Sequence, residues 1–256
     1  MIEISFKSMI AEKVAGKGVH SKKIPSGYQI LGDILLLKFP LKEKVSRKDK
    51  EIIGSEILDI FSYINTVCEM RFVRGEFRQP KVDIIVSRSD NPRLETLHTE
   101  HGVKYSLDVS KVMFSKGNHN ERMRLVHIVK PGETIVDMFA GIGYFSIALG
   151  KFSRVKKIYA IEKNKTAYQY LKKNIVLNEL DNVEPILGDC RKISKRISAD
   201  RVLMGYFPGT KRYLAAAFRF LKQRGTIHYH NLYKKKDLWW KPLEELEDVA
   251  KRSRYT

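Results

Sequence analysis

Hydrophobic and polar positions alternate differently in the two halves of the chain, and the pattern changes near residue 119. In the first half, short runs with the spacing of strands surround one long stretch with the spacing of a helix. In chain order they are two strands within 28–39, a helix over 47–64, and strands over 81–88 and within 95–112. We therefore expect a small α+β domain over residues 1–112.

From residue 119 onward, apolar strand patterns alternate regularly with helical patterns. The expected strands are 133–140, 156–162, 183–189, 200–206 and 225–232, and the expected helices are 121–129, 143–152, 164–180, 211–221 and 242–254. Such alternation is typical of a doubly wound, parallel α/β sheet with helices on both faces. We expect this second domain to span residues 113–256.

Composition supports a folded protein that acts inside the cell. Hydrophobic residues make up 43% of the 256 positions, which is enough to form a core. No apolar run reaches the roughly 18 residues that span a bilayer, and the first ten residues lack the layout of a signal peptide. Cys68 and Cys190 have no metal-ligand spacing. We expect a cytoplasmic, monomeric protein without a membrane segment.

The net charge changes this picture by indicating a partner. The chain carries 48 Lys and Arg against 29 Asp and Glu, a formal charge of +19. A basic solvated surface is the simpler interpretation, but a field of this size is suited to the phosphates of nucleic acid. The basic residues are spread along the sequence, so we expect folding to bring them onto one face.

Three acidic residues close consecutive expected strands of the second domain. Asp137 lies in the first strand, just before Gly141 and Gly143; Glu162 ends the second and Asp189 ends the third. An acid at the second strand end is placed to accept the ribose hydroxyls of a nucleoside. Asp189 is placed to accept the exocyclic amine of adenine, with the backbone N–H of the next residue, Cys190, on a ring nitrogen. We expect an adenosine site here.

The turn after the first strand favours S-adenosylmethionine over a dinucleotide. A dinucleotide favours a third glycine, which lets the pyrophosphate approach the helix N-terminus, but position 146 is Ser. Tyr144 and Phe145 also crowd that approach. S-adenosylmethionine has no phosphates and tolerates this turn.

Four sequence blocks resemble one enzyme family. These are 24–37 ("IPSGYQILGDILLL"), 101–125, 136–151 ("VDMFAGIGYFSIALGK") and 171–180 ("LKKNIVLNEL"). They resemble archaeal and eukaryotic enzymes that modify the guanosine beside the tRNA anticodon. The resemblance implies a class I methyltransferase-like, Rossmann-type sheet preceded by a smaller α+β domain that contacts tRNA. A complete sheet of that type has seven strands, whereas five are visible here, so we expect the last two to be cut off, disordered or absent.

The residues after the fourth strand separate the two branches of that family. The tRNA guanine-N1 methyltransferase branch carries a polar tripeptide such as Asn-Leu-Pro there, which fixes the guanine edge. Here the sequence is Gly205, Tyr206, Phe207, Pro208, similar to the wybutosine-synthesis aminocarboxypropyltransferase branch. That branch transfers the 3-amino-3-carboxypropyl arm of S-adenosylmethionine to carbon 7 of 4-demethylwyosine at position 37 of phenylalanine tRNA, with methylthioadenosine as the product.

The resemblance also indicates site residues. Ser115, Lys116 and Arg122 are expected to hold the carboxylate of the arm, although the two cations could instead contact tRNA phosphates or solvent. The full set of expected cofactor-binding residues is Ser115, Lys116, Arg122, Phe139, Ala140, Gly141, Glu162, Asp189 and Cys190. Tyr206, Phe207 and Pro208 are candidates for contact with the target base, where stacking and plain packing of the strand end are equally expected.

Some roles stay open at the level of sequence. No general base is evident, so the catalytic residues are unknown. His228 and His230 are spaced like metal ligands, but no third ligand is in view, and we expect structural or tRNA-facing roles and no metal. A guanine-N1 methyltransferase at the same position, or a tRNA-binding protein without activity, are the alternative functions.

Overall fold

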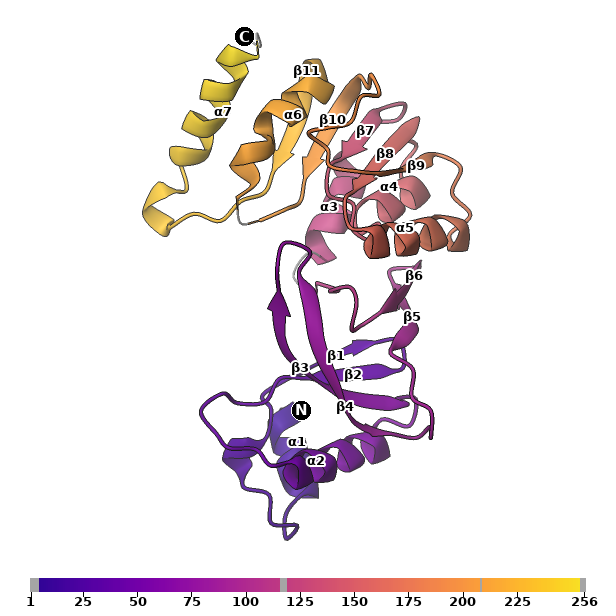
Figure 1. Ribbon diagram of the computed structural model, residues 1–256, viewed down its shortest axis with the longest axis vertical. Coiled ribbons are helices and arrows are strands. Elements are labelled where there is room, and N and C mark those ends of the chain that lie inside the picture. Colours follow the sequence, from indigo (N-terminus) through magenta and orange to yellow (C-terminus); the bar gives the residue numbers. More distant parts are fainter. Residues whose placement is uncertain (1–4, 116–118, 208, 254–256) are drawn as a thin grey trace. The chain divides into compact units, whose positions relative to one another are not determined.

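The computed structural model describes residues 5–115, 119–207 and 209–253. The chain forms two compact units, Met1–Lys116 and Gly117–Thr256, each with its own sheet and its own buried core (Figure 1). Within the described ranges, none of the helices combines the length and the apolar character that crossing a membrane requires.

The first unit is built on a four-stranded sheet with the order β1-β2-β3-β4. Only the β2–β3 pair is parallel, and a separate antiparallel hairpin, β5–β6, follows it. The elements are α1 (Phe6–Lys13), η1 (Ser21–Lys23), β1 (Tyr28–Leu31), β2 (Ile34–Leu37), α2 (Arg47–Ile60), β3 (Thr66–Arg74), β4 (Gln79–Ser87), β5 (Glu95–Glu100) and β6 (Val103–Asp108). The strands and the helix expected from sequence are present, but α1 and β3 were not anticipated.

Helix α2 begins at a capping box and packs on the sheet through a narrow apolar face. The Ser46 hydroxyl accepts the N–H of Asp49, and the Asp49 carboxylate accepts the N–H of Ser46. Ile53 and Ile57, on the sheet-facing side of α2, are fully buried. Gly54 lies so close to β4 that a Cβ there would stand 2.7 Å from Val86 Cγ2. The helix therefore needs a residue without a side chain at this position.

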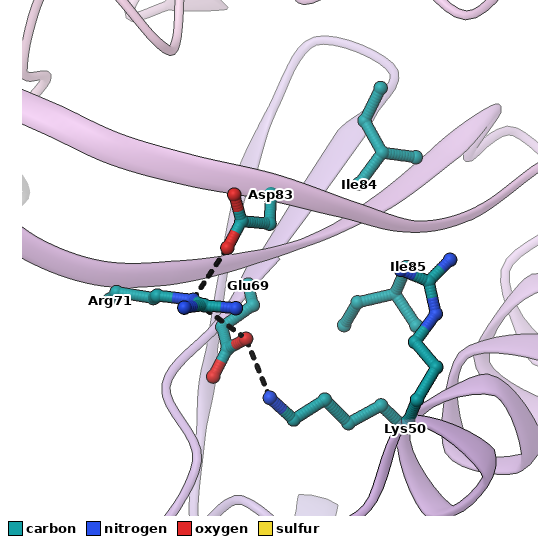
Figure 2. A pocket seen from close by; sticks show the side chains of 7 residues that line it. Lys50, Glu69, Arg71, Asp83, Ile84 and Ile85 are labelled. Atoms are coloured by element: carbon teal, nitrogen blue, oxygen red, sulfur yellow. Dashed lines mark hydrogen bonds and ion pairs between the residues drawn. The ribbon is translucent and has the colours of Figure 1, made fainter.

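A pocket beside α2 is lined by charges that are already paired with one another (Figure 2). Lys50 Nζ lies 2.7 Å from Glu69, and Arg71 Nε lies 2.5 Å from Asp83 and 3.4 Å from Glu69. These pairs join α2 to β3 and β4. Because Arg71 is half exposed, the outer pairs contribute little stability individually.

The second unit is a five-stranded sheet with the order β11-β10-β7-β8-β9, and every neighbouring pair is parallel. Helices α3, α4 and α5 lie on one face, and α6 and α7 on the other (Figure 1). The elements are α3 (His119–Ile128), β7 (Thr134–Asp137), α4 (Ser146–Phe152), β8 (Lys157–Glu162), α5 (Lys165–Leu177), β9 (Val183–Leu187), β10 (Ala199–Met204), η3 (Thr210–Tyr213), α6 (Leu214–Phe220), β11 (Leu221–Tyr229), η4 (Lys235–Asp237) and α7 (Lys241–Arg252). This is the predicted doubly wound fold.

Boundaries in this unit differ from the expected ones where backbone geometry overrides the apolar pattern. The first strand ends at Asp137 and the next helix begins at Ser146, because the loop between them contains Gly141 and Gly143 at positive φ. The expected helix 211–221 begins as the 3-10 turn η3, and β11 starts directly at its end.

The close approach of α2 to β4 gives a test of the first unit. We expect Gly54→Leu to lower the free energy of unfolding by about 1–3 kcal/mol, because the new side chain must displace Val86. Ser55→Leu, which adds the same side chain on the exposed side of α2, is the matched control. Urea denaturation of both variants checks this, and equal midpoints would contradict it.

Candidate functional site

The sheet of the second unit changes winding direction between β7 and β10, and its carboxyl edge at that point is where ligands bind in open α/β folds. The loop 138–145 forms this edge. Gly141 and Gly143 have φ of 58° and 100°. The Asn174 side chain, fully buried on α5, donates to the carbonyl of Ile142 at 3.0 Å. The loop is therefore held in one shape.

Glu162 joins this loop to the end of β8. Its Oε2 accepts the N–H of Gly141 at 2.7 Å, and its Oε1 accepts the N–H of Asn164 at 2.6 Å. Burial raises the pKa of this carboxyl above its ordinary value, although the two N–H groups oppose the shift. Each oxygen keeps a further lone pair, which suits a ligand that brings two hydroxyls.

Asp137 supports the loop from below and does not face a ligand. It is fully buried, and its carboxylate accepts the Ser146 hydroxyl at 2.7 Å and the N–H of Phe139 at 3.3 Å. Burial raises its pKa to about 6. Asp137 thus ties the end of β7 to the start of α4.

Asp189 follows β9 and binds Arg191. The guanidinium donates to the two carboxylate oxygens at 2.9 and 2.5 Å, and the N–H of Arg191 donates at 3.0 Å. These bonds lower the pKa of Asp189 to about 2. Next to it, Cys190 is buried, and burial raises its thiol pKa to about 12, so this thiol stays protonated.

Aromatic rings fill the space between the glycine-rich loop and the end of β10. Phe139 stacks on Tyr206 with ring centroids 5.1 Å apart, and Tyr213 meets both rings edge-on. Gly205 begins this segment, and a Cβ there would lie 2.9 Å from the ring of Phe145. The end of the fourth strand is therefore an aromatic surface rather than a polar one.

The residues expected at the carboxypropyl arm come from both units of the chain. Arg122 is buried on α3, and its guanidinium lies 5.6 Å from the ring centre of Tyr144 in the glycine-rich loop. Ser115 belongs to the first unit, so its contact with the cofactor stays a prediction. Lys116 and Pro208 lie outside the described residues, and Phe207 is partly buried.

His228, on β11, and His230, just after it, contact different residues. His228 Nε2 lies 2.6 Å from Arg201 Nη1, and Arg201 also binds Glu133 through two nitrogens. Burial and Arg201 lower the pKa of His228 to about 4, so it is neutral at pH 7. His230 lies 3.1 Å from Glu121 and stacks on Phe145. In the described part of the chain, no cluster of three His, Cys, Asp or Glu suits a metal ion.

Sequence reasoning missed Asn174 and the residues around Tyr213. Asn174 lies between Leu171 and Ile175 on the buried face of α5, and a polar residue on an apolar stripe was the available signal. Tyr213, Arg191 and Arg212 gave no signal, because their association depends on how the loops after β9 and β10 approach each other.

Two family models cover most of the chain. The TRM5/TYW2 methyltransferase domain matches residues 96–256, and the TYW2 N-terminal domain matches residues 7–88. The chain belongs to the TRM5/TYW2 family.

Named relatives of this TRM5/TYW2 chain fall in both branches of the family. A tRNA(Phe) (4-demethylwyosine(37)-C(7)) aminocarboxypropyltransferase from Methanocaldococcus jannaschii is 42% identical over 89% of this chain and 87% of that protein. The tRNA (guanine(37)-N(1))-methyltransferase Trm5b of Pyrococcus abyssi is 33% identical over 90% and 67%. The crystal structure of P. horikoshii TYW2 in complex with MeSAdo matches with a TM-score of 0.79 and 31% identity, covering 96% and 88%.

The two acids expected at the nucleoside site give a binding test. We expect Glu162→Ala and Asp189→Ala each to weaken S-adenosylmethionine binding at least tenfold, because each removes charged hydrogen-bond acceptors. tRNA binding should stay within about twofold, since neither loses a positive charge. Glu184→Ala, on β9 and paired with Lys195, is the control for calorimetry. Wild-type affinity in both test variants would remove these acids from the site.

Asp137 gives a pH test. Its pKa is about 6 in the folded chain against an ordinary value of 3.8. The folded state therefore holds the proton more tightly, and this stability is complete below about pH 3.8 and lost as the pH rises through 6. Asp137→Asn cannot titrate. Relative to wild type, the variant should gain about 2 kcal/mol of unfolding free energy between pH 4 and 7. Chemical denaturation across that range checks this, and a constant difference would contradict it.

Proposed function

We propose that this TRM5/TYW2 chain transfers the 3-amino-3-carboxypropyl group of S-adenosylmethionine to carbon 7 of 4-demethylwyosine at position 37 of phenylalanine tRNA. The observation that carries the proposal is the 42% identity, over nearly the full length of both chains, to a protein named for this reaction. A second support is the aromatic segment at the end of β10.

The residues of the second unit suit the donor molecule. Glu162 offers oxygens to the ribose hydroxyls, and Asp189 with the N–H of Cys190 offers an acceptor and a donor to the adenine edge. Gly141 keeps the loop free of a side chain beside the sugar. Arg122 is buried against Tyr144 of the same loop, and in this proposal it meets the carboxylate of the arm by a charge-assisted hydrogen bond.

The transfer is a nucleophilic substitution at the carbon of the 3-amino-3-carboxypropyl arm that is bonded to sulfur. The sulfonium makes that carbon electrophilic; the bond from carbon 7 to it forms as the sulfur–carbon bond breaks. The electron pair goes to sulfur, methylthioadenosine leaves, and carbon 7 loses its proton to solvent water. The contribution of the protein is alignment, since the reacting atoms must approach within about 3–3.5 Å in line.

The surface at Tyr206 favours a base that needs no polar partner. A guanine-N1 methyltransferase must take a proton from N1 and fix the base edge. The tricyclic wyosine precursor has already closed its ring across that edge. The Phe139–Tyr206 stack offers such a ring system a flat apolar surface, as single-stranded bases are commonly bound.

A guanine-N1 methyltransferase is the second candidate function. The 33% identity to Trm5b over 90% of this chain favours it, since both branches share the fold and the donor. We also propose that the protein is cytoplasmic and that it is a monomer. Light scattering of the purified chain checks the latter.

The group transferred is tested by labelling the donor at two positions. With phenylalanine tRNA that carries 4-demethylwyosine, we expect carboxyl label to enter the tRNA and methyl label to leave as methylthioadenosine. tRNA with unmodified guanosine at position 37 should stay unlabelled. Methyl label in either tRNA would assign the chain to the methyltransferase branch, and absence of label from both would indicate a binding protein.

A further inference from the structure

Two arginines that follow β10 have no carboxylate within 4.0 Å among the described residues: Arg212, beside the aromatic surface, and Arg219, on α6. Arg212 is exposed, and its guanidinium lies 5.8 Å from the ring centre of Tyr206 and 5.1 Å from that of Tyr213. Its Nη2 also reaches the Tyr206 hydroxyl at 3.4 Å. Stacking on two rings orients the guanidinium while its charge stays uncompensated.

Arg219, near the end of α6, is held by backbone carbonyls instead of aromatic rings. Its Nη2 donates to the carbonyls of Cys190 and Arg191, at 3.0 and 3.1 Å. Its side chain is exposed. Carbonyl oxygens fix the position of a guanidinium but do not cancel its charge.

The lack of a carboxylate distinguishes these two arginines from their neighbour. Within residues 5–115, 119–207 and 209–253, neither Arg212 nor Arg219 has an acidic partner within 4.0 Å, whereas Arg191 is bound by Asp189. Arg191 also lies 4.8 Å from the ring centre of Tyr213. Two fixed and uncompensated guanidiniums therefore border the residues proposed to hold the base and the adenine.

We propose that Arg212 and Arg219 bind phosphates of the tRNA strand that carries the target base. This inference rests on the proposed function, because it takes the ligand to be a single-stranded tRNA loop. Guanidinium presents a planar fork that fits phosphate oxygens. Phosphate contacts fix the register of a nucleic acid without reading its sequence, so these residues position the strand while the aromatic surface receives the base.

Binding of tRNA by charge-removing variants tests the inference. We expect Arg212→Gln and Arg219→Gln each to weaken tRNA binding about fivefold to tenfold. Each should also lower the slope of log affinity against log salt by about 0.7, the value for one single-strand phosphate. The control is Arg154→Gln, which removes an exposed arginine just before β8, at the opposite edge of the same sheet. S-adenosylmethionine binding by Arg212→Gln should equal that of wild type.

RNAs in which one backbone phosphate is uncharged identify the phosphate that each arginine contacts. Anticodon stem-loop RNAs are made with a methylphosphonate at one phosphate at a time around nucleotide 37. For Arg212→Gln, the loss of affinity relative to wild type should disappear with one of these RNAs and persist with the others. A different RNA should abolish the loss for Arg219→Gln. Losses that persist with every methylphosphonate RNA, or that equal the Arg154→Gln control, would overturn the inference.

The same measurements separate this inference from the proposed function. If wild type transfers carboxyl label but both variants bind tRNA as Arg154→Gln does, the phosphate contacts are wrong and the function stands. If wild type transfers no label, yet the methylphosphonate pattern appears, the contacts stand and the function is wrong.

Discussion

The carboxylate of Glu162 is the interaction on which the rest of the second unit's site depends. Its two oxygens accept N–H groups from Gly141 and Asn164, so one side chain fixes both the glycine-rich loop and the chain entering α5. Asn164 in turn caps α5 by accepting the N–H of Thr166 at 2.9 Å. A single, partly buried carboxylate thus aligns a loop, a strand end and a helix start.

The acidic and basic side chains of the site differ in how far they are exposed to solvent. Asp137 is fully buried and Glu162 partly buried, and burial raises the pKa of both, while Asp189, which binds Arg191, has a lowered pKa. Arg191, Arg212 and Arg219 are exposed. The total charge of +19 adds attraction at long range but does not provide this local order.

Much of the second unit could be predicted because, in a parallel sheet, the order of strands and helices along the chain determines which residues lie at the carboxyl edge. Once strands alternate with helices, residues that end strands must meet at one edge, and Asp137, Glu162 and Asp189 do so. Strand β3 was missed because its second half pairs only with β4 and is largely exposed, which removes the apolar signal. The arrangement of Arg212 on Tyr213 was missed because it depends on tertiary contacts between loops. The roles of Ser115, Lys116 and Pro208 stay predictions.

The contact between Gly205 and Phe145 constrains how this chain can diverge. Any side chain at 205 would press on the ring of Phe145, and that ring is itself stacked on His230. A side chain at position 205 therefore requires the Phe145 ring to shift or a smaller residue to replace it, and a smaller residue would remove the ring that stacks on His230 and leave the histidine its contact with Glu121. Mutational paths between chains with and without a side chain here must pass through coupled substitutions, so the effect of each step depends on the order in which the steps occur.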